Sequence, residues 1–430
     1  MQLIIHRGTH EIGGTCVEIA TNKTRILVDF GIPLVTAERK PFDAKTLQNR
    51  SISDLRATGD LPDIKGLYRE DVRSINAILL SHSHLDHYGL LDYVHPDIPI
   101  YMSRGADILI KVSNIFTPFK IDLPKVNMLA PKQNVIIGGL KIMPYLVDHS
   151  AFDALAFLIE GEGKRIFYSG DFRGHGRKSV LFNKMIEDPP KDIDCLLMEG
   201  SMIGRTDQKY KTEVDVQKRI EEILHEDKKI AFISMSSQNI DRIVSAYKAC
   251  LKTDSIFVID IYTAFILDKL RKVSKHIPQF NWKNMKVMFF HNHAQALEKA
   301  GYRDLLYVYN NKKIKTLDIN RSSKKYLIMA RDNSIFPHII KGIDNIKGAK
   351  FIYSMWEGYL KEKFVQYCDS KELIMETIHT SGHATVEDLK AIAGAMQPKR
   401  LIPIHTFEPE KYTELFHNVV LARDSEPILV

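Results

Sequence analysis

Cysteine is scarce in this 430-residue sequence: the four residues stand far apart, in neither a disulfide-rich nor a Cys-x-x-Cys pattern. We therefore expect a reduced, cytoplasmic setting. No apolar run approaches the ~18 residues needed to cross a bilayer, so no membrane partner is expected. The first residues show no basic region followed by an apolar core, which argues against a secretory signal. Glycine and proline number only 23 and 17, which excludes collagen-like and low-complexity chains.

What remains has a globular composition, with 44% hydrophobic and 26% charged residues. Chains longer than ~250–300 residues usually divide into domains. We therefore expect two domains, or one fold that carries a large insertion.

The positive charge is concentrated in one part of the chain. The net charge is +7 overall, whereas residues 271–350 alone carry +12 and are interleaved with aromatic residues. Basic side chains neutralise phosphates and aromatic rings stack on bases, so the mixture suits a single-stranded nucleic acid. The alternative is that the lysines solvate a surface while the aromatic residues fill a core.

Two patterns of predicted secondary structure divide the chain. Up to about residue 200, short apolar runs rich in β-branched residues read as strands, for example 16–20, 77–80, 141–146 and 165–168. From about residue 211, helices at 212–225 and 239–252 alternate with strands at 229–233 and 255–259. The last 60 residues repeat this alternation, with strands at 372–378 and 400–404 around a helix at 385–396. Such alternation predicts βαβ units and a parallel sheet.

A metal-binding motif follows the apolar run 77–80. Residues 81–87 read Ser-His-Ser-His-Leu-Asp-His, and this density of imidazoles exceeds what a core needs. His82 and His84, two apart in an extended turn, can converge on one metal, whereas Asp86 and His87 point to a second site. Mixed histidine and carboxylate ligands suit zinc or manganese.

The motif His-x-His-x-Asp-His after a buried strand resembles that of the metallo-β-lactamase family, whose αββα sandwich holds two metals at one sheet edge. Three further residues match the landmarks of that family in chain order. Asp29, in Leu-Val-Asp-Phe-Gly, matches the aspartate that orients the metal loop. His149, in Val-Asp-His-Ser, matches the third histidine, and Asp171, in Tyr-Ser-Gly-Asp-Phe, matches the bridging aspartate.

The second half of the chain resembles the β-CASP branch of this family, whose members process nucleic acids and insert an α/β domain. Glu199 in Leu-Met-Glu-Gly-Ser, His383 in His-Thr-Ser-Gly-His-Ala and His405 in Ile-Pro-Ile-His match its three motifs. A histidine in the third motif is typical of the RNA-cleaving members, such as ribonuclease J and the 3′-end-processing endonucleases. The sequence departs from ribonuclease J in two of these motifs. It has Glu-Gly-Ser where ribonuclease J usually has Glu-Ser-Thr, and His-Thr-Phe-Glu where ribonuclease J normally has His-Gly-Glu. These departures leave the RNA substrate and the end preference open.

The resemblance implies an α/β fold: a metallo-β-lactamase sandwich from residues 1–204 and 363–430, with a β-CASP domain inserted at 205–362. It also implies two divalent ions, with zinc expected and manganese as the alternative. The implied metal ligands are His82, His84, Asp86, His87, His149, Asp171 and His405. Asp86, Glu199 and His383 are the expected catalytic residues: Glu199 would orient His383, which would protonate the departing oxygen.

The function that we expect is metal-dependent hydrolysis of single-stranded RNA by a two-metal mechanism. The alternatives are a nuclease of single-stranded DNA, a hydrolase of a small ester, thioester or lactam, and an inactive scaffold. The basic segment and His383 argue against the small-molecule hydrolase, and the complete ligand set argues against the scaffold. The resemblance also leaves a homodimer open.

Several other residues have both a functional and a structural interpretation. Residues that could contact a substrate phosphate are Ser236, Ser237, Asn239, Arg331, His379 and Ser381. The first three open a helix, where an anion binds well, but N-capping explains them equally. Asp241 stands where ribonuclease J usually has a histidine. Trp356 could stack on a base, although we favour a place in the core.

Overall fold

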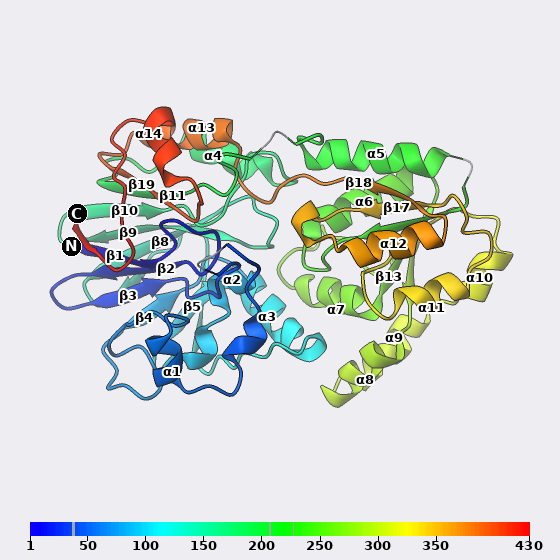
Figure 1. The fold of residues 1–430 in the computed structure, drawn as a ribbon, viewed down its shortest axis with the longest axis horizontal. Coiled ribbons are helices and arrows are strands. Elements are labelled where there is room, and N and C mark those ends of the chain that lie inside the picture. Colours follow the sequence, from blue (N-terminus) through cyan, green and yellow to red (C-terminus); the bar gives the residue numbers. More distant parts are fainter. Residues whose placement is uncertain (37–38, 206–207, 227) are drawn as a thin grey trace.

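The computed structural model describes residues 1–36, 39–205, 208–226 and 228–430 of the chain. Two lobes lie side by side along its long axis (Figure 1). The first is an αββα sandwich that contains both chain termini, and the second is an α/β lobe inserted into it. The predicted fold class is therefore confirmed.

The sandwich is built from two sheets packed face to face. The first sheet has the order β20 (Pro427–Leu429), β1 (Gln2–Arg7), β2 (Cys16–Ala20), β3 (Arg25–Val28), β4 (Ala77–Leu79), β5 (Ile100–Ser103) and β6 (Val126–Leu129). The second has the order β19 (Leu401–Ile404), β11 (Cys195–Glu199), β10 (Lys164–Tyr168), β9 (Leu155–Gly161), β8 (Leu140–Leu146) and β7 (Val135–Ile137). Fully buried residues of both, such as Ile26 and Val28 against Phe157 and Ile166, form one core between them.

Helices cover the outer face of each sheet. The first sheet is flanked by α1 (Ile52–Ala57), α2 (Leu85–Tyr88) and α3 (Arg104–Phe116), with the 3₁₀ turns η1 (Ala44–Leu47) and η2 (Leu91–Tyr93). The second is flanked by α4 (Ser179–Glu187), α13 (Val386–Met396) and α14 (Tyr412–Leu415), with η4 (Pro409–Lys411). Two further apolar clusters fill the space between helices and sheets.

The inserted lobe is built on a parallel sheet with helices on both faces. Its strand order is β15 (Lys313–Ile314), β14 (Met285–Met288), β13 (Ile256–Asp260), β16 (Tyr326–Met329), β12 (Ile230–Ser234), β17 (Lys350–Tyr353) and β18 (Ile374–Thr377). Every residue of β12 and β16 is buried, which explains why these strands read as continuous apolar runs.

Eight helices connect the strands of the inserted lobe in the part of the chain that the structure describes. One face carries residues of α5 (Glu213–His225), α6 (Ile240–Lys252), α7 (Ile261–Leu270), α8 (His291–Lys299) and α9 (Arg303–Asn310). The other carries residues of α10 (Thr316–Arg321), α11 (Phe336–Lys341) and α12 (Glu362–Ser370), and η3 (Glu357–Tyr359) follows β17.

The pairing of β18 bears on where the insertion ends. β18 pairs in parallel with β17 over four residues, from Lys350 with Ile374 to Tyr353 with Thr377. The inserted sheet therefore continues to Thr377, beyond the boundary at residue 362 that the sequence suggested. We propose that the chain returns to the sandwich after Thr377. Within the described residues, no helix has the length and apolar character needed to cross a membrane.

Candidate metal centre

The predicted site residues come together at one edge of the sandwich. The pairs β3–β4, β10–β11 and β11–β19 are parallel, so the carboxyl ends of these strands share that edge. The strand ends supply Asp29, His82, Asp171, Glu199 and His405, while His149 follows β8 and Asp86 and His87 lie in α2. His84 is the N-cap of α2, and His383 lies between β18 and α13.

The carboxylate oxygen Oδ2 of Asp171 is central to this cluster. It lies 3.2 Å from Nε2 of His87, 3.7 Å from Nε2 of His82 and of His405, and 4.0 Å from Nε2 of His149. One oxygen therefore faces two groups of ligands at once, as in a carboxylate that bridges two metals through a single oxygen. Burial raises the pKa of Asp171, but His405, His87 and His383 outweigh this and hold the pKa well below its usual value.

The donor atoms have the spacing and the chemistry of a metal centre. Nδ1 of His84 lies 3.2 Å from Nε2 of His149, and Oδ2 of Asp86 lies 3.8 Å from Nε2 of His405. Ligand atoms around a tetrahedral metal with bonds of about 2.0–2.1 Å stand about 3.3 Å apart. Within the described part of the chain, Oδ2 of Asp171 and Nε2 of His405 are buried and make no hydrogen bond. The residues therefore fit a metal ion.

Each coordinating histidine is turned so that one nitrogen points into the cluster. The other nitrogen of four of them lies near an oxygen: His87 with Asp29 at 2.8 Å, His82 with Ser81 Oγ at 3.0 Å, His149 with the Gly382 carbonyl at 2.5 Å and His405 with Thr15 Oγ1 at 2.8 Å. For His87, His82 and His149, an Nδ1–H that donates to these oxygens leaves Nε2 free to bind a metal. Nδ1 of His405 also accepts from the backbone N–H of Gly13 at 3.3 Å. Burial also lowers the pKa of His84 to about 4, which favours the neutral, metal-binding form.

Asp29 makes the contacts expected of a residue that orients the metal loop. Its carboxylate accepts hydrogen bonds from the backbone N–H and the hydroxyl of Ser81, both at 2.7 Å, from His87 at 2.8 Å and from the Tyr168 hydroxyl at 2.6 Å. Its φ of 60° is unusual for a residue other than glycine. This strained turn at the end of β3 is held by four hydrogen bonds, all of them fully buried.

Glu199 and His383 form a pair beside the metal cluster. Nδ1 of His383 lies 3.3 Å from Oε2 of Glu199 and 3.7 Å from Oδ2 of Asp171. Glu199 is held by the backbone N–H groups of Phe172, Ala384 and Ser201. The side chain of His383 is 23% exposed, whereas those of His87 and His405 are buried. Burial lowers the pKa of His383, but Glu199 and Asp171 outweigh it and raise the pKa above its usual value.

Behind the metal cluster lies a buried network of charges that the sequence analysis did not identify. Arg173 is fully buried and donates to Asp148 at 3.4 Å, to Asp241 at 2.7 Å and to Glu213 at 3.4 Å. It also donates to the carbonyl of Ser381 at 2.7 Å. Two of these partners belong to the inserted lobe. Arg173 therefore ties that lobe to segments that carry His149 and His383.

Arg242 of α6 completes this network. It is fully buried and donates to Glu213 at 3.0 Å, to the Ser354 hydroxyl at 2.5 Å and to the carbonyl of Thr380 at 3.1 Å. Burial raises the pKa of Glu213, but Arg242 and Arg173 outweigh it and hold the pKa well below its usual value. The network also explains why aspartate stands at position 241, since its carboxylate pairs with Arg173 and Lys178.

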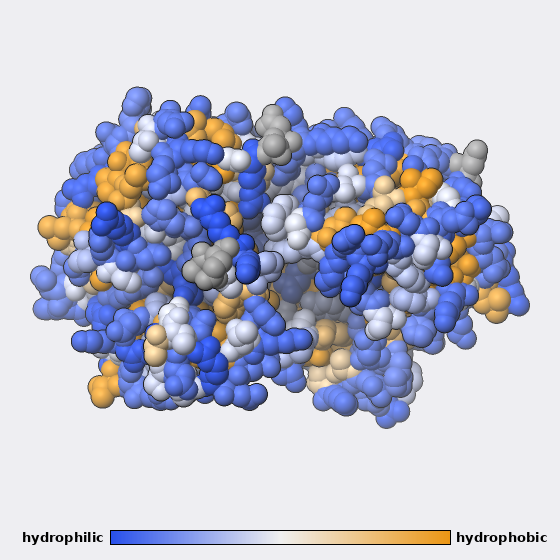
Figure 2. Space-filling view, viewed as in Figure 1, coloured by the Kyte–Doolittle hydropathy of each residue, from blue (hydrophilic) through white to orange (hydrophobic). Residues whose placement is uncertain are grey.

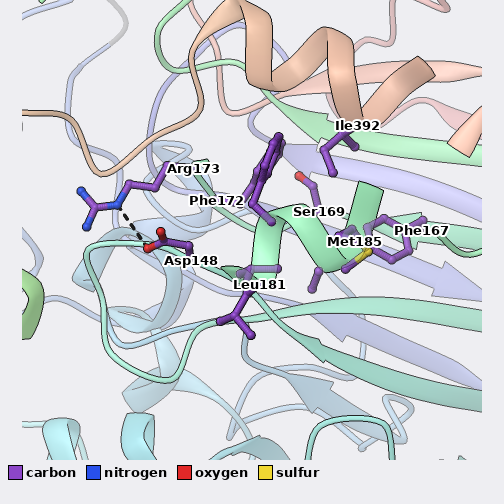
Figure 3. Close-up of a pocket in the computed structure, with 11 residues that line it drawn as sticks. Asp148, Phe167, Ser169, Phe172, Arg173, Leu181, Met185 and Ile392 are labelled. Carbon is purple, nitrogen blue, oxygen red and sulfur yellow. Dashed lines mark hydrogen bonds and ion pairs between the residues drawn. The ribbon is translucent and has the colours of Figure 1, made fainter. Parts of the chain in front are cut away.

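The Asp148–Arg173 pair borders an apolar environment. Figure 3 shows the two side chains at one end of a small cavity of about 20 Å³, whose other labelled walls include Phe167, Phe172 and Met185. Little water can therefore screen this pair, and its charges depend on their partners. One indication of this pair is present in the sequence: Asp148 directly precedes His149, and Arg173 follows Asp171 by two residues.

The six candidate phosphate residues already have protein partners. Asn239 is the N-cap of α6 and accepts from the Arg242 N–H. Ser237 lies 2.6 Å from the Thr263 hydroxyl and accepts from Arg331, which also pairs with Asp260.

The other three lie close to the buried network or to the turn before α6. His379 lies 3.4 Å from Arg242, and burial lowers its pKa to about 3. Ser381 Oγ accepts from the His383 N–H, and Ser236 Oγ accepts from the Gln238 N–H. The phosphate role of all six stays a prediction.

Part of the basic segment lies at the outer end of the inserted lobe (Figure 1). Figure 1 places α10 at the outer end of the inserted lobe, at the opposite side of that lobe from α2. Lys325 donates to the carbonyls of Leu224 and Glu226 at the end of α5, and Lys324 pairs with Asp254. These contacts favour the interpretation in which the lysines serve a solvated surface.

Comparisons with known proteins agree with this geometry. Residues 51–234 match a family described as the beta-lactamase superfamily domain, and residues 372–415 match the Zn-dependent metallo-hydrolase RNA specificity domain. A structure of a protein of unknown function from Enterococcus faecalis superposes with a TM-score of 0.80 at 21% identity, covering 100% of this chain and 99% of that one.

Curated relatives are similar over different lengths. An RNase J-like protein of Methanocaldococcus jannaschii is 23% identical over 66% of this chain and 63% of its own length. Ribonuclease J of Mycoplasma genitalium is 22% identical over 93% of this chain and 66% of its own. Cleavage and polyadenylation specificity factor subunit 3 of Dictyostelium discoideum is 29% identical over 30% of this chain and 19% of its own.

The chain thus spans at most about two thirds of the length of these curated relatives. Both matched domains contain residues of the cluster: the first includes the segment from His82 to Glu199, and the second includes His383 and His405. The chain therefore carries a domain of the beta-lactamase superfamily and an RNA specificity domain, and it is similar to ribonuclease J, in keeping with the resemblance to the β-CASP branch.

Proposed function

We propose that this protein is a metal-dependent nuclease that hydrolyses phosphodiester bonds of single-stranded RNA. The observation that carries the proposal is Oδ2 of Asp171, which faces two groups of ligands and lies 3.7 Å from His383. A metal centre with a separate acid beside it suits phosphodiester hydrolysis. The names of the relatives, ribonuclease J and RNase J-like protein, support RNA as the substrate.

We propose two divalent ions, zinc rather than manganese. One would be held by His82, His84, His149 and Asp171, and the other by Asp86, His87, Asp171 and His405. When bound, the ions would supply Lewis-acid activation of the phosphoryl group and would lower the pKa of water. The preference for zinc follows from the predominance of imidazole ligands.

His383 would act as the general acid. With Nδ1 toward Glu199, the opposite edge of the ring carries Nε2, and the side chain is 23% exposed, whereas those of His87 and His405 are 1% exposed. Nε2–H can then donate its proton to the oxygen that leaves the phosphorus. The carboxylate of Glu199 keeps Nδ1 protonated and stabilises the charged imidazolium. A homodimer stays a prediction, which analytical ultracentrifugation would check.

The test uses protein purified without chelator, supplied with Zn²⁺ or Mn²⁺, and 5′-labelled single-stranded RNA and DNA of the same sequence. We expect cleavage of RNA with about two metal ions per chain by elemental analysis. His383→Ala should keep both ions while the cleavage rate falls ~10²–10⁴-fold, the usual contribution of a positioned general acid. His276→Ala, an exposed histidine of the inserted lobe, is the matched control.

Two outcomes would contradict the proposal. Absence of RNA cleavage by the fully loaded protein would exclude the nuclease, and preference for DNA would exclude RNA as the substrate. Loss of metal from His383→Ala would show instead that His383 is a ligand, an arrangement in which it joins His149 and Asp171.

A further inference from the structure

Two aromatic side chains that follow β17 are exposed at the junction of the lobes. Trp356 is 47% exposed and Tyr359 is 58% exposed, so the expectation that Trp356 belongs to the core is wrong. Their rings meet edge to face, with centroids 5.1 Å apart. Adjacent exposed aromatic rings offer a surface of the kind that is enriched at interfaces.

A cation lies against this aromatic pair. The guanidinium of Arg205 lies over the Trp356 ring, 5.2 Å from its centroid. Arg205 follows Glu199 by six residues, whereas Trp356 belongs to the segment after β17. Positive charge from the segment after β11 and aromatic surface from the segment after β17 therefore meet. Figure 2 shows the surface hollowed between the two lobes.

Hydrogen bonds place Arg205 near the metal ligands. Ser201 donates from its backbone N–H to Glu199 at 3.0 Å and from its hydroxyl to the His405 carbonyl at 3.3 Å. The backbone N–H of Arg205 donates to the Met202 carbonyl at 3.1 Å. Arg205 thus closes a turn that starts at residues bonded to Glu199 and His405.

The backbone next to Trp356 is shaped to hold the indole. A Cβ at position 358 would lie 2.3 Å from the indole ring of Trp356. Only glycine therefore allows the ring to lie back on the turn of η3. The backbone N–H of Tyr359 donates to the Trp356 carbonyl at 3.1 Å and closes that turn. The backbone at Gly358 thus contacts the indole ring, and the guanidinium of Arg205 lies over it.

We propose that Trp356, Tyr359 and Arg205 bind one nucleotide of a single strand next to the metal centre. Its base stacks on the indole in place of the guanidinium, and Arg205 pairs with its phosphate. The inference rests on the proposed function in taking a single strand as the ligand. Because stacking tolerates any base, the site selects unpaired nucleotides rather than a sequence.

The experiment uses the intrinsic fluorescence of Trp356. The sequence has two tryptophans, Trp282 and Trp356, so Trp282→Phe leaves Trp356 as the only one. The metal-loaded protein is titrated with a 2′-O-methyl RNA strand, which resists cleavage, and the same strand carrying a dye reports binding by anisotropy. We expect saturable quenching, and strands with a single abasic position should lose it at one position only.

Variants then separate this site from binding elsewhere. Trp356→Ala should raise the Kd for the strand about 5- to 150-fold, the usual range for loss of one stacked base, and Trp356→Phe less. Gly358→Ala should act in the same direction by displacing the indole. For cleavable RNA, Trp356→Ala should raise KM more than it lowers kcat. Tyr307→Ala is the control, an exposed tyrosine of α9.

Binding without quenching, or with equal affinity in Trp356→Ala, would overturn the inference and leave the proposed nuclease intact. Quenching by the strand without cleavage of any RNA would support the nucleotide site and contradict the nuclease. Quenching by the complementary duplex as strong as by the single strand would also overturn the inference, because paired bases cannot stack on the indole.

Discussion

Replacing Arg173 tests whether the buried charge network holds the two lobes together. Arg173→Met keeps a long side chain but removes the positive charge. The network contains three carboxylates, on Asp148, Glu213 and Asp241, and three cations, on Arg173, Arg242 and Lys178. The substitution therefore leaves three buried carboxylates with two cations, Lys178 and Arg242, so one negative charge is uncompensated.

The expected cost follows from that uncompensated charge. Removing one partner of a buried ion pair typically costs about 3–5 kcal/mol. This is a large part of the ~5–15 kcal/mol that stabilises a typical domain. The matched control is Arg69→Met, whose guanidinium is half exposed and lies 3.5 Å from an equally exposed Asp92. Its loss should cost about 0–1 kcal/mol.

Urea unfolding of the metal-loaded protein, followed by fluorescence and by circular dichroism, measures both costs. A double variant sharpens the test. Arg173→Met with Asp241→Asn restores an equal number of carboxylates and cations in the network, so it should be more stable than Arg173→Met alone. A loss for Arg173→Met no greater than for Arg69→Met, or no recovery in the double variant, would refute the reasoning.

Two further predictions concern backbone packing and pH. Gly31→Ala should lose metal and lower the free energy of unfolding by about 1–3 kcal/mol, because the added Cβ would lie 1.6 Å from the carbonyl oxygen of Asp86. Gly394→Ala in α13 is the control: there a Cβ meets open space, so the substitution should be neutral or stabilising. Burial raises the pKa of Glu18, but hydrogen bonds from His6 and Arg25 lower it to about 2. The ionised carboxylate therefore stabilises the folded protein fully above the unfolded-state pKa of 4.5, and this stabilisation is lost as the pH falls toward 2. Glu18→Gln should therefore cost about 1 kcal/mol less at pH 4 than at pH 7 in urea unfolding; an equal cost at both pH values would contradict this.

Local patterns predicted most of the regular structure. The predicted helices at 212–225, 239–252 and 385–396 are confirmed as α5, α6 and α13, each with its first predicted residue as the N-cap. The predicted parallel sheet is confirmed. It was predictable because strands buried on both faces appear in the sequence as continuous apolar runs. In these segments the side chains that determine the element are neighbours in the sequence.

Features that depend on distant partners were not predictable in this way. Arg173 and the Ser381 carbonyl are 208 residues apart in the sequence, and no local pattern indicates that they meet. The end of the inserted sheet depends on the pairing of β18 with β17. The basic residues near α10 suggested a nucleic-acid surface, but a count of charges does not show which carbonyls and carboxylates they contact.

The place of the insertion relates the charge network to the chemistry. Glu199 ends β11 before the inserted lobe and His383 follows β18, the last strand of its sheet, yet these two side chains lie 3.3 Å apart. Glu199 and His383 thus depend on how the inserted lobe is seated. By contrast, His82, His84 and His87 lie within one short segment of the sandwich, whose orientation is set by Asp29. A weakened network should therefore disturb the Glu199–His383 pair before it disturbs those three ligands. For any Arg173 variant that still folds, the cleavage rate should accordingly fall further than the metal content.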